Sequence, residues 1–92
     1  MSDRPTKILE NGSKLWLNSE GRQHREGDLP AAIWADGTYE WIKNGAPHRD
    51  NDLPAIISPN RHCIWLSGGK IIKAKYCTKA QIEEFKKPYG GK

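Results

Sequence analysis

Short apolar runs alternate along this chain with stretches rich in glycine, asparagine, aspartate and proline. Apolar runs this short, bounded by turn residues, are typical of β-strands rather than helices. The alternation is clearest at Tyr39 and Trp41, which share one face of an expected strand, while Thr38, Glu40 and Ile42 share the other. The pattern therefore predicts a sheet of antiparallel strands.

Pairs of turn residues separate several of these runs. They are Asn11-Gly12, Asp36-Gly37 and Asn44-Gly45. Asn-Gly and Asp-Gly favour type I′ hairpin turns, in which both central residues have positive φ. We therefore expect three hairpins and a last strand: residues 7–9 with 14–17, 31–34 with 38–42, and 55–58 with 62–66, followed by 70–76.

One stretch of the chain occurs twice. RQHREGDLPAAI, at residues 22–33, returns as APHRDNDLPAII at residues 46–57, an offset of 24 residues. A repeat of this length usually corresponds to one supersecondary unit that packs against its neighbours. A repeat architecture is therefore expected.

Three units follow from this alignment, at about residues 11–35, 36–59 and 60–77. Trp16, Trp41 and Trp65 hold the same place in them. The third unit lacks the His-Arg and Asp-Leu-Pro-Ala motifs, so it has either drifted or become a cap. The predicted fold is mainly β: a single domain (residues 1–92) formed by an antiparallel meander of hairpins from two to three ~24-residue repeats, with one short C-terminal α-helix.

The helix is expected at about residues 79–87. Thr78 and Gln81 have the spacing of a capping box. Ile82 and Phe85 fall on one helical face and should pack on the sheet. The remaining helix side chains are expected in solvent; they are Lys79, Glu83, Lys86 and Lys87.

Composition adds limits to this picture. Four Trp and three Tyr supply core anchors despite 28% charged residues and a mean hydropathy of −0.82. No apolar run approaches the roughly 20 residues of a membrane span, and none resembles a secretion signal, so a cytoplasmic protein without membrane contact is expected. Cys63 and Cys77 are expected to be free thiols. The net charge is +4, and residues 70–92 carry a large share of the lysines, which favours an acidic partner.

The pattern HR..DLPA.I..DG...W..NG, at about residues 11–69, resembles tandem repeats of the form HRE.GPA...DG...W..NG. Such repeats occur in small proteins of tailed bacteriophages and other large viruses, and they are loosely similar to MORN-type β-hairpin repeats. This chain has Leu29 and Leu53 where glycine is usual. The resemblance implies a short viral accessory protein that binds and disables a host or defence component.

The His-Arg pairs at residues 24–25 and 48–49 are the most conspicuous candidates for chemistry. A set of residues present in both copies is best explained by what each repeat needs in order to fold. We expect each arginine to bind the aspartate of its own loop, with the imidazole lying on a tryptophan; these pairs are Arg25 with Asp28 and Arg49 with Asp52. Alternatively, Arg25 and Arg49, with Arg61, bind phosphate or carboxylate on an extended partner.

No motif supports catalysis, and neither a cofactor nor a metal is expected. His62, Cys63 and Cys77 offer three soft ligands without the paired spacing of a zinc site. There is no nucleophile elbow, phosphate-binding loop or paired carboxylate in an apolar setting. The protein is therefore expected not to be an enzyme.

Residues outside the repeated set are the better candidates for partner binding. Trp34 has Ser58 as its counterpart in the second unit. It is either a core residue near the first hairpin or an exposed anchor for a partner. The other candidates are basic or aromatic residues towards the C-terminus: Lys70, Lys73, Lys75, Tyr76, Lys79, Lys86 and Lys87. We expect Lys73 and Lys75 to share a strand face with Ile71.

Two functions remain open. The first is a non-enzymatic interaction module, a phage-encoded inhibitor of a host or anti-phage defence protein. The second is a nucleic-acid-binding protein, for RNA rather than DNA, that acts on a nuclease or toxin together with its RNA. An unpaired hairpin edge also permits oligomerisation.

Overall fold

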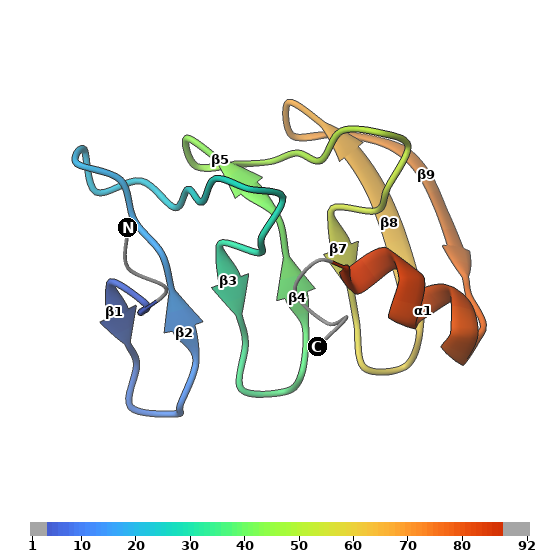
Figure 1. Cartoon of the computed structure of the whole chain (residues 1–92), viewed down its shortest axis with the longest axis horizontal. Coiled ribbons are helices and arrows are strands. Elements are labelled where there is room, and N and C mark those ends of the chain that lie inside the picture. Colours follow the sequence, from blue (N-terminus) through green and yellow to red (C-terminus); the bar gives the residue numbers. More distant parts are fainter. Residues whose placement is uncertain (1–3, 88–92) are drawn as a thin grey trace.

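The computed structural model describes residues 4–87, and most strands lie side by side in one antiparallel sheet (Figure 1). The order in this seven-stranded sheet is β1-β2-β3-β4-β7-β8-β9. Its strands are β1 (Lys7–Ile8), β2 (Lys14–Leu15), β3 (Ala32–Ile33), β4 (Tyr39–Glu40), β7 (Ile56–Ile57), β8 (His62–Ser67) and β9 (Lys70–Tyr76). A separate hairpin pairs β5 (Ile42–Lys43) with β6 (Ala46–Pro47), and α1 spans Lys79–Lys86. The predicted fold class, a mainly β meander with one C-terminal helix, is confirmed.

Each expected hairpin forms, and its strands are shorter than the sequence indicated, except for β8, which is one residue longer. β1 pairs with β2, β3 with β4, and β7 with β8. The expected strand over residues 38–42 divides at Trp41, because β4 belongs to the large sheet whereas β5 belongs to the small one. The rings of Tyr39 and Trp41 are stacked, with centroids 6.4 Å apart, so these two side chains share a face as predicted.

The turns differ in kind. Asn44 and Gly45 both have positive φ, as a type I′ turn requires. At the other two pairs only the glycines, Gly12 and Gly37, have positive φ, so the type I′ prediction is wrong there. The loop of each of these hairpins is one residue longer than a type I′ loop, and the glycine is its last residue. The glycine N–H closes the turn, as in the bond from Gly12 N to the Leu9 carbonyl at 2.9 Å.

The third hairpin repeats this turn without the glycine. The N–H of Arg61 donates to the carbonyl of Ser58 at 3.0 Å, and Arg61 has a φ of 70°. An arginine therefore occupies a left-handed conformation that favours glycine.

Two apolar clusters form the core. The larger contains Trp41, Ala55, Ile57, Cys63, Trp65, Leu66 and Cys77, and the smaller contains Leu15, Ala31, Ala32 and Ile42. Cys63 and Cys77 are free and buried, and burial together with the hydrogen bond to Cys77 raises the pKa of the Cys63 thiol to about 12. The Cys63 thiol is therefore protonated at neutral pH, and both cysteines serve as small core residues.

The helix packs on the larger cluster as predicted. Thr78 Oγ1 accepts from the N–H of Gln81, and Gln81 Oε1 accepts from the N–H of Thr78, which confirms the capping box. The Phe85 ring meets Trp65 edge-on at 5.7 Å. The expectation that Lys86 lies in solvent is wrong, because its ammonium lies 5.0 Å from the centroid of the Tyr39 ring and only 21% of its side chain is exposed.

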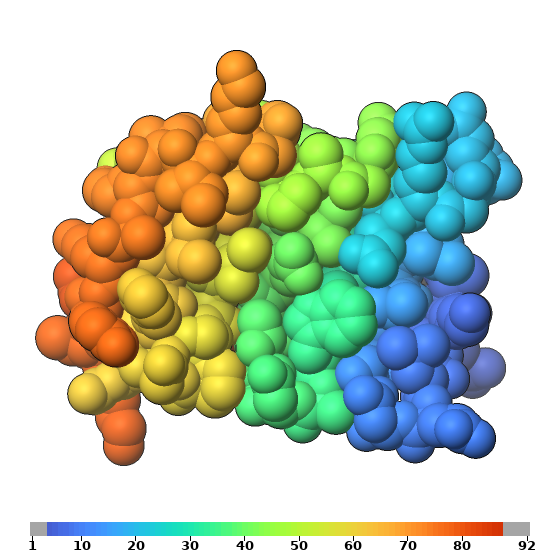
Figure 2. Space-filling view, turned by 180° about the vertical axis from the view of Figure 1, so that it is seen from behind, coloured from blue at the N-terminus to red at the C-terminus, as the bar shows by residue number. Residues whose placement is uncertain are grey.

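The last strand, β9, forms one rim of the molecule, where it is visible at the end of the sheet and from behind (Figures 1 and 2). An extra residue, Ile72, interrupts its register with β8, so that Ile71 lies opposite Leu66 and Lys73 opposite Trp65. The expectation that Ile71 shares a face with Lys73 and Lys75 is therefore wrong, since a β-bulge breaks the two-residue alternation.

Candidate functional site

The repeated arginines lie on the repeated tryptophans. The guanidinium carbon of Arg25 is 3.9 Å from the ring centroid of Trp16, and that of Arg49 is 3.8 Å from the centroid of Trp41. Each arginine also donates to the carbonyl of the proline in its own loop, at 3.1 Å for Arg49 and Pro54. The prediction that an imidazole covers the tryptophan is wrong, because the flat guanidinium takes that place and gains a cation–π attraction.

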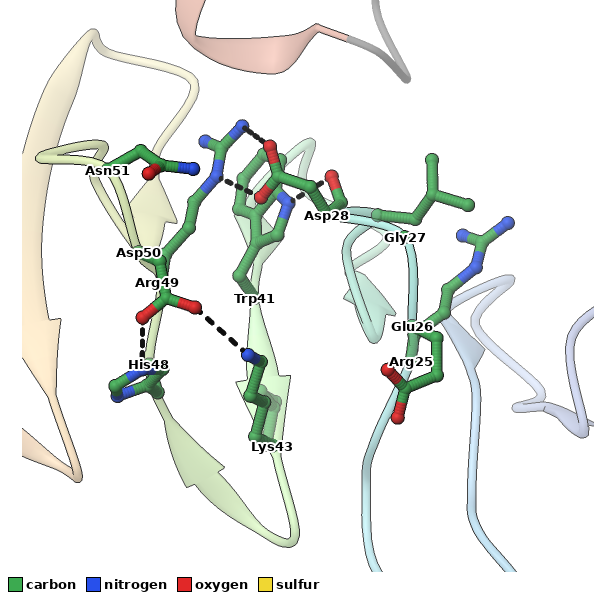
Figure 3. Close-up of a pocket in the computed structure, with 12 residues that line it drawn as sticks. Arg25, Glu26, Gly27, Asp28, Trp41, Lys43, His48, Arg49, Asp50 and Asn51 are labelled. Atoms are coloured by element: carbon green, nitrogen blue, oxygen red, sulfur yellow. Dashed lines mark hydrogen bonds and ion pairs between the residues drawn. The ribbon is translucent and has the colours of Figure 1, made fainter.

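Arg49 binds the aspartate of the preceding repeat, as Figure 3 shows. Its Nε donates to Asp28 Oδ1 at 2.9 Å and its Nη2 to Asp28 Oδ2 at 3.2 Å, a bidentate ion pair. The indole N–H of Trp41 donates to the Asp28 carbonyl at 3.0 Å. The predicted pairing of Arg49 with Asp52 is therefore wrong, because each loop reaches forward onto the tryptophan of the next unit. The geometry likewise gives no ion pair between Arg25 and Asp28, since Arg49 holds that carboxylate.

The third unit uses a lysine in place of the arginine. The indole N–H of Trp65 donates to the Asp52 carbonyl at 2.9 Å, as Trp41 does one unit earlier. The Nζ of Lys73 lies 4.5 Å from the Trp65 centroid and 3.9 Å from Asp52 Oδ1. Lys73 of β9 thus makes two of the contacts that Arg49 makes one unit earlier, one with the tryptophan and one with the aspartate.

The repeated histidines tie each unit to the next turn. His24 Nδ1 accepts from the N–H of Asn44 at 3.1 Å, and His48 Nδ1 accepts from the N–H of Gly68 at 3.0 Å. This pattern assigns the neutral tautomer with the proton on Nε2, which donates to an acidic residue two positions further on in each loop. Both imidazole nitrogens are therefore engaged within the chain.

The carboxylates that accept these bonds are Glu26 and Asp50. The hydrogen bond from His24 lowers the pKa of the Glu26 carboxyl. The pKa of Asp50 is lowered by the hydrogen bond to His48 and then by the one to Lys43, whose Nζ lies 3.1 Å from Asp50 Oδ2. Both groups remain charged at neutral pH.

These contacts leave little space between the first two units. A cavity of about 90 Å³ is lined by residues that include Asp28, Leu29, Trp41, His48 and Arg49. Several of its polar groups bind one another: Arg49 binds Asp28, and Asp50 binds His48 and Lys43 (Figure 3). The site is therefore a joint between repeats, in which polar side chains hold neighbouring units together.

A wider groove, of about 470 Å³, lies at the N-terminal end of the array. Arg4, Thr6, Trp16, His24 and Arg25 are among its lining residues. The sequence contains a signal for this end that the repeat alignment missed. Arg4-Pro5 precedes β1 at the same spacing at which Leu29-Pro30 precedes β3.

The candidate partner-binding residues on β9 lie together. All residues of this strand are exposed, and the exposed fraction of Ile71, Ile72 and Tyr76 is 69%, 68% and 69%. The Tyr76 ring stacks on His62, with centroids 4.7 Å apart and planes 13° apart. Lys70, Lys73 and Lys75 therefore stand along an edge that also presents apolar side chains.

The other candidates lie elsewhere. Trp34 is half-buried against the smaller core cluster, and its indole N–H donates to Glu40 Oε1 at 2.8 Å. Arg61 and Lys79 line an open groove of about 790 Å³ between the β7–β8 turn and α1. Lys87 lies at the end of the helix, where its carbonyl accepts from Arg49 and its ammonium lies 3.1 Å from Glu84.

The fold and the joints between units define a short array of β-hairpin repeats with a basic C-terminal edge strand. Comparison with protein-family models, curated proteins and solved structures finds no match to the chain. Among residues 4–87, no helix has the length and apolar character needed to cross a bilayer. A functional assignment therefore rests on the chain's own residues.

Proposed function

We propose that this protein is a non-enzymatic interaction module that binds another protein through strand β9. The observation that carries the proposal is the exposure of every residue of β9 at the end of the sheet. Edge strands in proteins are normally short, charged, bulged or covered, because their unpaired backbone groups attract other strands; β9 has lysines and a bulge, but it is seven residues long and every residue is exposed. A long edge with Ile71, Ile72 and Tyr76 exposed is a site for a partner.

The repeated polar residues support a role without catalysis. Arg49 and Asp28 bind one another, and both histidine rings hold neighbouring turns. A catalytic base needs a proton to abstract from a substrate within hydrogen-bond reach. In the described joints, the hydrogen-bonding groups of these arginine and histidine side chains bind other parts of the chain and hold the repeats together.

The resemblance to viral repeat proteins supplies the biological setting of the proposal. In that setting the protein acts in the cytoplasm of an infected cell as an inhibitor or modulator of a host or anti-phage defence protein. The lysines at 70, 73 and 75 favour an acidic surface on that partner.

A second candidate function is RNA binding, and one observation favours it. Tyr76 stacks on His62 beside the lysines of β9, and single-stranded RNA is bound by aromatic stacking combined with contacts from basic side chains to the phosphate backbone. Ile71 and Ile72, however, are exposed on the same strand, and exposed apolar side chains mark surfaces that bind other proteins. The protein partner is therefore the better-supported candidate.

The test compares affinity purification of the parent with two charge-reversal variants, with and without nuclease treatment. Lys70→Glu/Lys75→Glu changes the β9 edge, and Lys7→Glu/Lys14→Glu makes the same change of charge at the other end of the sheet. The proposal expects a protein that the parent and the control retain, that Lys70→Glu/Lys75→Glu loses, and that survives nuclease. A complex that nuclease removes, and that weakens by orders of magnitude as salt rises, supports RNA instead.

A further inference from the structure

The backbone of β9 presents alternate hydrogen-bonding groups to solvent. In an antiparallel pair, two residues directly opposite either exchange both backbone bonds or turn both sets of groups away from each other. The carbonyl of Ile64 accepts from Ala55 N–H at 2.8 Å, on the β7 side of β8. Its cross-strand neighbour, Ala74, therefore turns its N–H and C=O away from β8, towards the outer edge.

The same reasoning applies two residues further on. The carbonyl of His62 accepts from Ser58 N–H at 3.0 Å, and Tyr76 lies opposite His62. In contrast, Cys77 N–H donates to the Arg61 carbonyl at 3.0 Å, so it points inward. Ala74 and Tyr76 thus offer a ladder of two outward donors and two outward acceptors, at the spacing that an added strand needs.

The side chains of this edge specify what kind of strand fits. Lys73 and Lys75 alternate with Ala74 and Tyr76, so one face of the edge is basic and the other is small and aromatic. A strand paired alongside places its own alternate residues next to these two sets. Acidic residues next to the lysines and apolar residues next to Ala74 and Tyr76 complement both faces.

A second copy of the chain does not meet this requirement. Antiparallel pairing of two β9 strands about a two-fold axis at Ala74 would place Lys73 of each copy opposite Lys75 of the other. Like charges directly opposite one another destabilise a strand pair. The lysines therefore oppose self-association and favour an acidic strand.

The geometry points to β-strand addition: an extended partner segment with alternating acidic and apolar residues pairs with β9 as an eighth strand of the large sheet. This inference rests on the proposed function, because it names how the partner of β9 binds. Main-chain bonds to Ala74 and Tyr76 supply affinity, and the charges of Lys73 and Lys75 supply selectivity.

The first test uses a blocked peptide of alternating glutamate and valine, of the same length as β9, and a matched peptide with lysine for glutamate. Amide hydrogen exchange of the parent protein is followed by NMR. With the acidic peptide at about ten times its Kd, exchange at Ala74 and Tyr76 should slow about tenfold. The amides of Lys73 and Lys75 should change little, since they already pair with β8. Unchanged exchange at Ala74 and Tyr76, or equal binding of the lysine peptide, overturns the inference.

The second test removes an outward donor. Ala74→Pro deletes an N–H that faces solvent, and proline is tolerated at such an edge position. Affinity for the acidic peptide should fall about fivefold to tenfold, while the melting temperature changes little. Lys75→Pro is the matched control, because it removes an inward donor and should lower the melting temperature. If Ala74→Pro binds as the parent does, strand addition is refuted.

Two outcomes separate this inference from the proposed function. If the cellular partner is lost from Lys70→Glu/Lys75→Glu but retained by Ala74→Pro, the partner uses the side chains of the edge without adding a strand. If the protein alone dimerises and protects the same amides, a second copy is the occupant and the inference is wrong. Sedimentation equilibrium of the parent over a range of concentrations distinguishes that case.

Discussion

The joint between the first two repeats predicts that the repeated aspartate contributes more to stability in the first unit than in the second. Asp28 and Asp52 are equivalent residues, and both have positive φ, at 56° and 57°. Asparagine tolerates this conformation as well as aspartate does, so Asp28→Asn and Asp52→Asn change the charge with little backbone strain. The two variants therefore isolate the ion pair that each residue makes.

The surroundings of the two carboxylates set the expected magnitudes. Asp28 accepts two bonds from Arg49, whose side chain is only 1% exposed. Hydrogen bonds to charged groups contribute about 1.5–3 kcal/mol and are roughly twice as strong as neutral ones, so Asp28→Asn should cost about 2 kcal/mol. Asp52 is 86% exposed and 3.9 Å from Lys73, so Asp52→Asn should cost about 0.5 kcal/mol or less.

Urea unfolding followed by tryptophan fluorescence measures both variants, and calorimetry gives the melting temperatures. In a domain of this size about 2 kcal/mol corresponds to a fall of roughly 8–16 °C, and about 0.5 kcal/mol to at most about 4 °C. An unchanged m-value would show that the folded and unfolded states are otherwise comparable. Equal losses in the two variants would refute the assignment of Arg49 and Asp28 as the joint.

Two further predictions concern the turns and the acidic residues of the loops. Arg61→Gly should stabilise the protein by about 1 kcal/mol, measured by urea unfolding, because glycine relieves the left-handed arginine; a clear loss of stability would contradict this account. Glu26 and Asp50 have pKa values that are lowered in the folded protein, so their contribution is complete above the unfolded pKa and is lost as pH falls towards the folded values. Glu26→Gln/Asp50→Asn should therefore lower stability at pH 7 and have less effect near pH 3, as measured by thermal unfolding in a pH series; a parallel shift at every pH would oppose it.

Much of the secondary structure follows from local signals in the sequence. The Asn44-Gly45 turn needs only positive φ at adjacent positions, and the capping box needs only Thr78 and Gln81 at the right spacing. Such signals act within a few residues, where the covalent chain already fixes the neighbours. The turn at Asn44-Gly45 and the helix start could therefore be predicted, whereas no apolar run indicates β6, the second strand of the hairpin that this turn closes.

The joints could not be predicted in the same way. Asp52 is close to Arg49 in sequence, yet Arg49 binds Asp28, because loop direction depends on how whole units pack. The bulge at Ile72 likewise arises from pairing with β8, which no local pattern encodes. Lys73 takes over the contacts of an arginine only because β9 folds back over Trp65.

The forward reach of each loop has a consequence for how such a chain can lengthen. Each of the first two units carries a socket, formed by its tryptophan and arginine, and a plug, formed by the aspartate of its own loop; the third unit carries only a socket, formed by Trp65 and Lys73. Tandem duplication of a whole unit within the array would copy both halves of the joint at once. Insertion or deletion of complete units therefore preserves every joint. A break within a unit instead leaves one tryptophan and its cation without the aspartate that binds them.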